Sequence, residues 1–226
     1  NMGSNNDISL KALAKINLGL DVVRRREDGY HEVRMIMQTI QLYDRLDIKR
    51  TQEPGIQIQT NLSFLPVKEN NLIYKAAKLL MDEFSITDGV SVKLDKRIPV
   101  AAGMAGGSTD AAAMLIGVNR LFSLGLTKRQ LMERGVQIGA DVPYCIMRGT
   151  ALAEGIGEAL SPLPPMVKCT VLVAKPSISV STKFVYQNLK LDDTTIHPDI
   201  DRLIDDIKAK NLHDIAAHMG LSLIHI

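Results

Sequence analysis

Three separated stretches of this chain carry residue types that could transfer a phosphoryl group. The first is Pro99–Ala113, with the sequence PVAAGMAGGSTDAAA, in which small residues lead into a strong helix former. The opening N–H groups of a helix have no partner inside it, and the helix dipole places partial positive charge there. Glycines let a ligand come close to the backbone. This stretch therefore predicts a phosphate-binding loop.

The loop matches neither of the common nucleotide motifs. No lysine follows Gly107, and no G-x-G-x-x-G pattern opens directly from a strand. A cation and a base for phosphate chemistry must therefore come from elsewhere in the chain. A turn that binds nothing, with Ser108 or Thr109 as an ordinary helix cap, is the plainer alternative.

The other two stretches supply a lysine and a carboxylate. Residues 8–23 alternate in polarity like a strand, which places Lys15 and Asn17 on one face. In Gly139-Ala-Asp-Val-Pro, the glycine should end a helix and the proline should hold Val142 extended, so Asp141 is expected on a connection. The residues alone leave two alternatives open, a solvated lysine on the strand and a turn-capping aspartate.

Composition narrows the class of protein. The chain has 226 residues, a net charge of +2 and 46% hydrophobic residues, enough for one large or two small domains. No basic run exceeds Arg24-Arg25-Arg26 and tryptophan is absent, which argues against a nucleic-acid partner. The spacing of Cys145 and Cys169 fits no zinc motif. Without a signal peptide or a membrane-spanning run, the pattern predicts a reduced, cytoplasmic protein with no membrane partner.

Alternation and helical spacing predict the elements around these stretches. Extended segments are expected over 30–42, 44–50 and 56–60, with a turn at Pro54-Gly55, so that the first 60 residues form a meander of strands. A helix over 71–84 and a strand over 89–94 should precede the glycine-rich loop, and the helix after the loop should end near Gly125.

The second half is expected to contain one strand and several helices. Thr127 and Gln130 form a capping-box pattern at the start of a helix. Lys168–Ala174 is a strongly β-type run. Short helices are expected from Thr182, as a cap, to Leu189, and over 198–210 and 212–219.

Several motifs in register resemble the GHMP kinase family. They are Ala14-Lys-Ile-Asn-Leu, Asp28-Gly-Tyr-His, Asn71-Leu-Ile, the glycine-rich loop, Gly139-Ala-Asp-Val-Pro and Lys175-Pro176. The resemblance covers about residues 10–189. The resemblance implies an α/β (α+β) fold of two domains. The N-terminal domain, 1–162, would be like domain 2 of ribosomal protein S5. The C-terminal domain, 163–226, would be ferredoxin-like and incomplete.

The resemblance also assigns the site. It implies ATP with Mg²⁺, Asp141 as the catalytic base, Lys15 as its charged neighbour, and Ser108 near the metal. It further implies a substrate that is a cytidine diphosphate alcohol of the non-mevalonate isoprenoid pathway, touching Asn17, Tyr30, His31 and Tyr186. The residues expected at ATP are Asn71, Pro99, Val100, Ala101, Ala102, Gly103, Met104, Ala105, Gly106, Gly107, Ser108 and Thr109.

The sequence does not decide between two rival functions, and it leaves two explanations for the end of the chain. The rivals are another small-molecule kinase, of the homoserine or mevalonate type, and a non-catalytic nucleotide-binding fragment. The family's second glycine-rich motif is missing, and Leu221–Ile226 resembles a translated sequencing adaptor, which predicts a chain truncated after Gly220. A native terminal strand is the alternative, and the sequence says nothing of oligomeric state.

Overall fold

The fold contains two long strands, β1 (Asp7–Arg25) and β2 (His31–Thr51). Each contributes residues to both of the compact units into which the chain divides. The computed structural model describes residues 6–178, 181–192 and 195–221. Unit 1 comprises the chain through Ala14, Gln41–Val100 and Met104–Met147. Unit 2 comprises Lys15–Ile40, Ala101–Gly103 and the chain from Arg148 onward.

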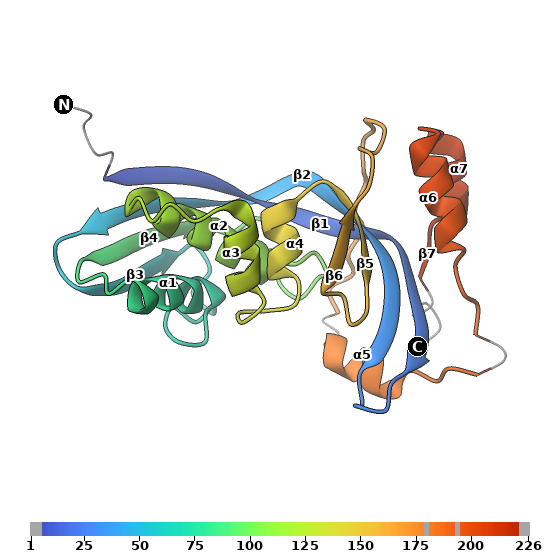
Figure 1. The fold of residues 1–226 in the computed structure, drawn as a ribbon, viewed down its shortest axis with the longest axis horizontal. Coiled ribbons are helices and arrows are strands. Elements are labelled where there is room, and N and C mark those ends of the chain that lie inside the picture. Colours follow the sequence, from blue (N-terminus) through green and yellow to red (C-terminus); the bar gives the residue numbers. More distant parts are fainter. Residues whose placement is uncertain (1–5, 179–180, 193–194, 222–226) are drawn as a thin grey trace. The chain divides into compact units, whose positions relative to one another are not determined.

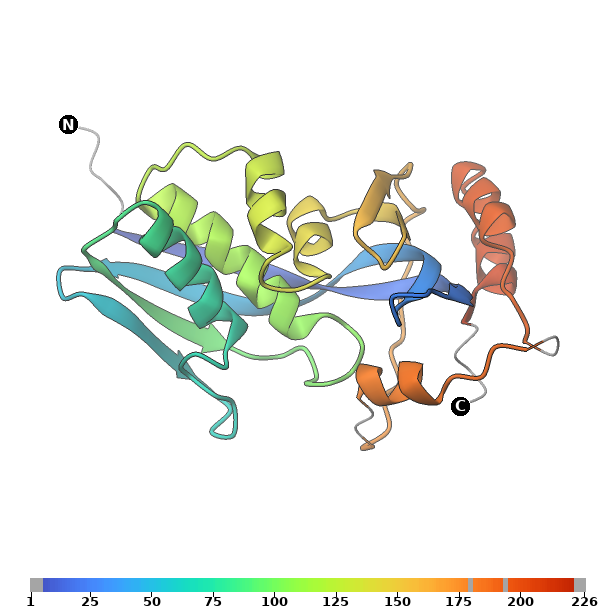
Figure 2. The same ribbon diagram turned by 60° about the horizontal axis from the view of Figure 1, so that its bottom comes forward.

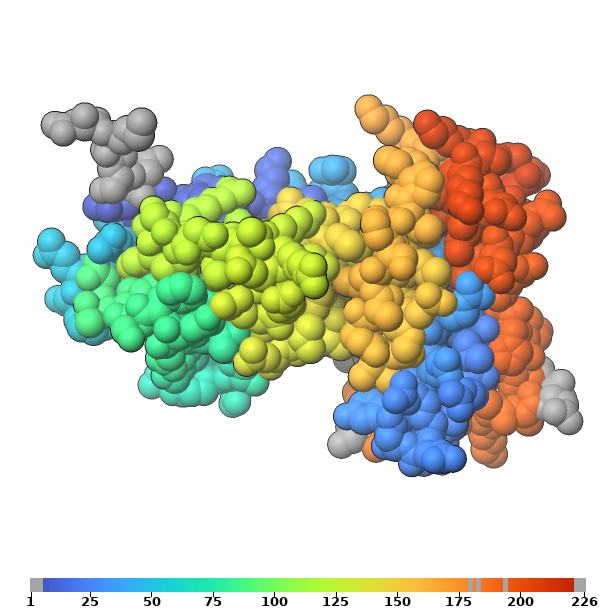
Figure 3. Space-filling model, viewed as in Figure 1, coloured from blue at the N-terminus to red at the C-terminus, as the bar shows by residue number. Residues whose placement is uncertain are grey.

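In unit 1, helices cover one face of a sheet (Figures 1 and 2). The second half of β2 pairs antiparallel with β4 (Gly89–Asp95), which pairs parallel with β3 (Gly55–Thr60). Gly117 lies so close to the sheet that an added Cβ would stand 2.4 Å from Ile48 Cδ1, so a side chain there would force Ile48 to move. From the side shown in Figure 3 the helices hide most of these strands. The covering helices are α1 (Leu72–Glu83), α2 (Gly106–Leu121), α3 (Lys128–Gly135) and α4 (Val142–Met147).

Unit 2 is built on the other halves of the long strands. The first half of β2 pairs antiparallel with β5 (Thr150–Glu154), which forms a hairpin with β6 (Ala159–Pro162). The short strand β7 (Gly220–Leu221) pairs parallel with β1. Three helices complete the unit: α5 (Thr182–Asn188), α6 (Ile200–Lys208) and α7 (Leu212–His218).

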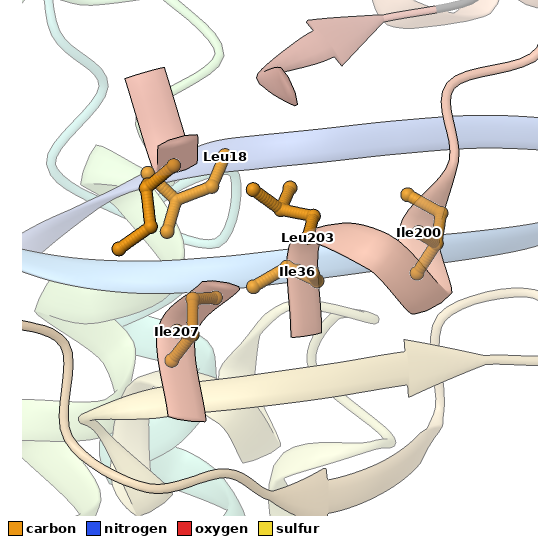
Figure 4. Packing of buried hydrophobic residues seen from close by; sticks show 6 residues of the cluster. Leu18, Ile36, Ile200, Leu203 and Ile207 are labelled. Atoms are coloured by element: carbon orange, nitrogen blue, oxygen red, sulfur yellow. The ribbon is translucent and has the colours of Figure 1, made fainter. Parts of the chain in front are cut away.

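The core of unit 2 joins its strands to its last two helices. Figure 4 shows the packed side chains pointing toward one another from β1, β2 and α6. At the rim of this core the Arg34 guanidinium pairs with Asp201 at 2.8 Å, which ties β2 to the first turn of α6. The buried cluster consists of Leu18, Ile36, Ile200, Leu203, Ile207 and Ile215.

Most predicted elements are present, and the predicted capping box is confirmed. The side chain of Asn71 caps α1 by accepting from Ile73 N at 2.8 Å. Thr127 and Gln130 form both bonds of the predicted capping box of α3. Cys145 and Cys169 are not joined by a disulfide. No helix in the described ranges is both long and apolar enough to cross a membrane.

The predicted meander is wrong in its last strand. β4 lies between β2 and β3, and β3 runs parallel to β4. Parallel neighbours need a crossover connection rather than a tight turn, and α1 provides it. The expected strand at Lys168–Ala174 is also absent, since these residues are exposed coil. A run of β-type residues becomes a strand only where another strand can pair with it, and no described strand does so here.

Local boundaries differ at three helices. Val142 is helical rather than extended, because Pro143 falls in the first turn of α4, where its missing N–H is not needed. The cap of α5 is Ser181, which accepts from Phe184 N at 3.1 Å, and not Thr182. α2 starts at Gly106 and ends at Leu121, before the predicted Gly125.

The structure tests neither the predicted domain boundary nor the predicted end of the chain. The linear division at residue 162 into an S5-like and a ferredoxin-like part stays a prediction. Apart from Leu221, which belongs to β7, the segment predicted to be an adaptor lies outside the described residues.

Candidate active site

The glycine-rich loop turns into α2 without a side-chain cap. Ala101, Gly103 and Ala105 all have positive φ, at 54°, 70° and 56°, and Ala105 is the N-cap residue. The plainer alternative, with Ser108 or Thr109 as the helix cap, is therefore wrong. The left-handed conformation of Ala105 starts α2 at Gly106, so Ser108 and Thr109 lie inside the helix rather than before it. Alanine in this conformation is strained, which is a frequent feature of ligand-binding loops.

The early start of α2 places three N–H groups at the end of the loop. Thr109 N donates to Ala105 O at 2.8 Å, the first bond of the helical pattern. The N–H groups of Gly106, Gly107 and Ser108 precede it and have no acceptor inside the helix. They lie at the positive end of a 16-residue helix dipole. The helix start thus has the backbone geometry of an anion site, and phosphate binding there stays a prediction.

The turn that carries Asp141 lies beside this helix start. A Cβ added to Gly139 would stand 4.0 Å from Ser108 Oγ, so the two motifs are neighbours within unit 1. Val142 N donates to Gly139 O at 3.1 Å and fixes the turn. Asp141 is half-buried just before α4, and its carboxylate makes no hydrogen bond or ion pair among the described residues. The Asp141 side chain therefore does not cap a turn or a helix.

Beneath the helix start is a buried charge cluster that the sequence did not reveal. Lys96 Nζ bonds to one carboxylate oxygen of Asp44 and, at 3.0 Å, to Oδ2 of Asp110. All three side chains are buried. Asp110 Oδ1 has no hydrogen-bond partner within the described part of the chain. Lys96 directly before the loop was the available signal, but nothing local pairs it with Asp44, 52 residues earlier.

Asp110 should make stability depend on pH. Burial, with the nearby Asp44 carboxylate acting against Lys96, raises the pKa of Asp110 well above its ordinary 3.8. The folded protein then holds a proton that the unfolded chain releases. The free energy of unfolding should therefore fall as pH rises from about 4 through the raised pKa, by at most about 1.4 kcal/mol per pH unit.

Denaturant unfolding of wild type and Asp110→Asn between pH 5 and pH 8 measures this effect. The asparagine variant carries no proton there, so its stability should fall less steeply across that window. Parallel curves for the two proteins would contradict the assignment.

In unit 2, Lys15 and Asn17 lie together as predicted from their spacing. Lys15 Nζ donates to Asn17 Oδ1 at 3.3 Å. The lysine is only 6% exposed, so it is not the solvated surface residue that the alternative supposed. No carboxylate pairs with it among the described residues. A buried ammonium without an acidic partner is costly, which is typical of a functional residue.

The aromatic residues of unit 2 form a second group. The rings of His31 and Tyr186 are 5.4 Å apart between centroids and tilted by 40°. Tyr30 is 61% exposed at the tip of the β1–β2 hairpin, where its N–H donates to Asp28 Oδ1 at 3.1 Å. Burial, followed by the positive charge of Arg25, lowers the pKa of His31, so the imidazole is neutral near pH 7. A neutral ring beside a phenol suits stacking on a base.

The other residues predicted to bind ATP differ in how far they are exposed to solvent. Pro99, Val100 and Gly107 are exposed, whereas Met104 and Thr109 are buried and offer only their backbone. Asn71 uses its amide as the α1 cap and as a donor to Pro66 O at 2.8 Å. Its contact with ATP, like the other assigned roles, stays a prediction. Lys15 and Asp141 belong to different units, so their pairing stays a prediction too.

Comparison with known proteins decides the family. Residues 71–149, which hold α1, the glycine-rich loop and the Asp141 turn, match the model described as "GHMP kinases N terminal domain". Over 210 residues the chain is 60% identical to the 4-diphosphocytidyl-2-C-methyl-D-erythritol kinase of Lachnoclostridium phytofermentans. The aligned stretch covers 93% of this chain and 72% of that protein. The chain belongs to the GHMP kinase family.

Other members of the GHMP kinase family agree with this. A relative with the same name from Lachnospira eligens is 59% identical over 94% of this chain and 74% of its own length. The crystal structure of a 4-(cytidine 5'-diphospho)-2C-methyl-D-erythritol kinase superposes with a TM-score of 0.73 at 32% identity, covering 89% of this chain and 72% of that one.

A more distant structure shows the fold alone. Homoserine kinase from Cytophaga hutchinsonii gives a TM-score of 0.72 at 16% identity, over 97% of this chain and 73% of that one. The predicted mixed α/β GHMP kinase fold is thus confirmed, and the chain is a kinase of this family.

Proposed function

We propose that this GHMP kinase transfers the γ-phosphoryl group of ATP to the 2-hydroxyl of 4-diphosphocytidyl-2-C-methyl-D-erythritol. The observation that carries the proposal is the approach of Gly139 to Ser108 Oγ, at 4.0 Å from an added Cβ. It supports a site in which the Asp141 carboxylate, which makes no hydrogen bond or ion pair among the described residues, faces the N–H groups at the start of α2. The names of the two relatives near 60% identity supply the substrate.

Asp141 would act as the general base. An alcohol is a poor nucleophile at neutral pH, so a carboxylate must take its proton as the oxygen attacks phosphorus. The new O–P bond forms while the bond between the β,γ-bridging oxygen and the γ-phosphorus breaks, and ADP leaves with that electron pair. The N–H groups of Gly106, Gly107 and Ser108 would hold the phosphate oxygens throughout.

Lys15 would supply the fixed positive charge that the loop lacks. A loose phosphoryl-transfer transition state needs electrostatic stabilisation more than covalent help. The proposal requires Lys15 to act beside Asp141, with Asn17 orienting its ammonium through the 3.3 Å hydrogen bond.

The residues present fit a metal that arrives with the nucleotide. The hydroxyl of Ser108 is half-buried, and no side chain at Gly139 covers it. No group of three His, Cys, Asp or Glu side chains in the described ranges could hold a metal ion without further ligands. Ser108 would therefore contribute one ligand to Mg²⁺ and the phosphates the others. When bound, Mg²⁺ neutralises charge that develops on the phosphates.

The decisive assay follows ADP release by the 226-residue chain from ATP and Mg²⁺. We expect ADP with 4-diphosphocytidyl-2-C-methyl-D-erythritol and none with homoserine or mevalonate, which tests the rival kinases. The Lachnoclostridium phytofermentans relative, assayed in parallel, serves as the positive control. ATP binding without turnover on any alcohol would instead favour a non-catalytic fragment. A cytoplasmic location belongs to this proposal, as it fits a small, phosphorylated metabolite.

Tyr186 should act on the cytidine end of the substrate. Base–aromatic stacking is worth about 1–3 kcal/mol, so Tyr186→Ala should raise KM for the cytidine substrate about tenfold and leave KM for ATP unchanged. Tyr186→Phe keeps the ring beside His31 and should behave like wild type. Phe184→Ala, at an exposed position on the same helix, is the matched control. Equal effects of the two alanine variants would refute a specific stacking role.

A further inference from the structure

The two glycines at the start of α2 face different surroundings. A Cβ on Gly106 would stand 2.7 Å from Lys96 Nζ and 3.3 Å from Ile98 Cγ2. A Cβ on Gly107 would meet only Leu72 Cδ1, at an ordinary 3.5 Å. The protein itself therefore has room for a side chain at Gly107, which is exposed, and none at Gly106.

The end of Lys96 cannot simply move aside. A lysine tip is normally flexible, but this ammonium is buried and bonded to both Asp44 and Asp110. Breaking either bond would leave a buried polar or charged group without its partner, which costs more than the bond itself. The tight approach at Gly106 therefore depends on both carboxylates.

These contacts fix the chain on both sides of the glycine-rich loop. Before the loop, Asp44 Oδ1 accepts from the backbone N–H groups of Arg97 at 2.5 Å and Ile98 at 2.7 Å. The amide of Asn61 pairs with both backbone groups of Lys96, at 2.8 and 3.1 Å. After the loop, Asp110 belongs to α2 itself. Lys96 joins the two sides, so the cluster spans the loop from beneath.

We infer that the buried Asp44–Lys96–Asp110 bridge is a positioning device for the phosphate loop, and that Gly106 lacks a side chain to admit this bridge rather than the nucleotide. Gly107 alone keeps space for phosphate. The inference rests on the proposed function, because it assumes that ATP binds at the start of α2. None of the three residues of the bridge need touch ATP. They hold the donor N–H groups in place.

Asp110 is the best residue for the test, because its loss leaves Lys96 and Asp44 as a balanced pair. Asp110→Ala should weaken ATP binding about tenfold, the scale of a lost hydrogen bond to a charged group. Asp110→Asn keeps an oxygen that can accept from Lys96 Nζ and should restore affinity to within about threefold. Titration calorimetry with ATP and Mg²⁺ gives both dissociation constants. Asp95→Asn, in the exposed pair with Arg97, is the control.

Alanine variants of Gly106 and Gly107 give an independent test, because protein stability and ATP affinity should respond differently in the two. Gly106→Ala should displace Lys96, weaken ATP binding like Asp110→Ala, and lower the thermal midpoint by about 2–4 °C, the size of a 1 kcal/mol loss. Gly107→Ala should leave the midpoint unchanged or raise it, since alanine favours helix. It should still weaken ATP binding, because its methyl group projects where phosphate approaches.

The outcomes separate the two proposals. If Gly107→Ala binds ATP like wild type, ATP does not use this helix start and the proposed function fails there. If Gly107→Ala weakens binding but folded Asp110→Ala and Gly106→Ala do not, the positioning role alone is wrong. Equal losses in Asp110→Ala and Asp110→Asn would mean that an oxygen accepting from Lys96 Nζ is not what positions the loop, which also overturns it.

Discussion

We expect Asp141→Asn to lower kcat about 10²–10⁴-fold while the affinity for ATP stays within about twofold of wild type, since loss of a general base costs turnover on that scale. Asparagine has nearly the same shape but cannot accept the substrate proton. The carboxylate makes no bond to the described protein, so the thermal midpoint should not change. Single-turnover phosphoryl transfer at saturating ATP measures the loss directly.

The control for Asp141 is an aspartate of unit 1 with no proposed role. Asp82 pairs with Lys78 on the exposed face of α1, so Asp82→Asn should retain wild-type kcat. Wild-type turnover by a folded Asp141→Asn would show that another group accepts the proton.

Lys15→Met is expected to lower kcat about 10²–10³-fold, the scale seen when one preorganised electrostatic group is removed. Methionine has a similar length and is apolar, so it suits a position that is 6% exposed. Replacing a buried charge that lacks an acidic partner should not lower the thermal midpoint. A structural role predicts the opposite pattern, with lower stability and normal turnover.

A second lysine serves as the comparison for Lys15. Lys93 is exposed on β4, and Lys93→Met should leave both kcat and the thermal midpoint unchanged. If folded Lys15→Met turns over within threefold of wild type, Lys15 does not stabilise the transition state.

Local signals predicted the elements well, and partner-dependent features less well. The capping box at Thr127 is a short-range pattern, and it forms as expected. The order of the strands in unit 1 depends on which strand α1 carries the chain to, and alternation of residues does not encode that. Lys168–Ala174 shows the same limit, because its residue types favour a strand but pairing needs a neighbour.

The candidate site was predictable where its chemistry is contiguous in sequence. The glycine-rich loop and the Asp141 turn were identified separately, and the structure brings them together within unit 1. The bridge beneath the loop was not predictable, because it joins a residue of β2, the residue that follows β4 and a residue of α2. An ordinary aspartate five residues into a helix and a lysine at a strand end gave no sign of each other.

The exposed run at Lys168–Ala174 has a consequence for handling the protein. Leu172 is 93% exposed, and its neighbours Val171 and Val173 are exposed too. Apart from Lys168 the segment carries no charge and no proline, and a β-prone run of this kind with open backbone groups is a template for pairing between chains. Concentrated solutions of this chain should therefore tend to aggregate through this segment, and solubility should depend on it more than on the charged surface of the helices.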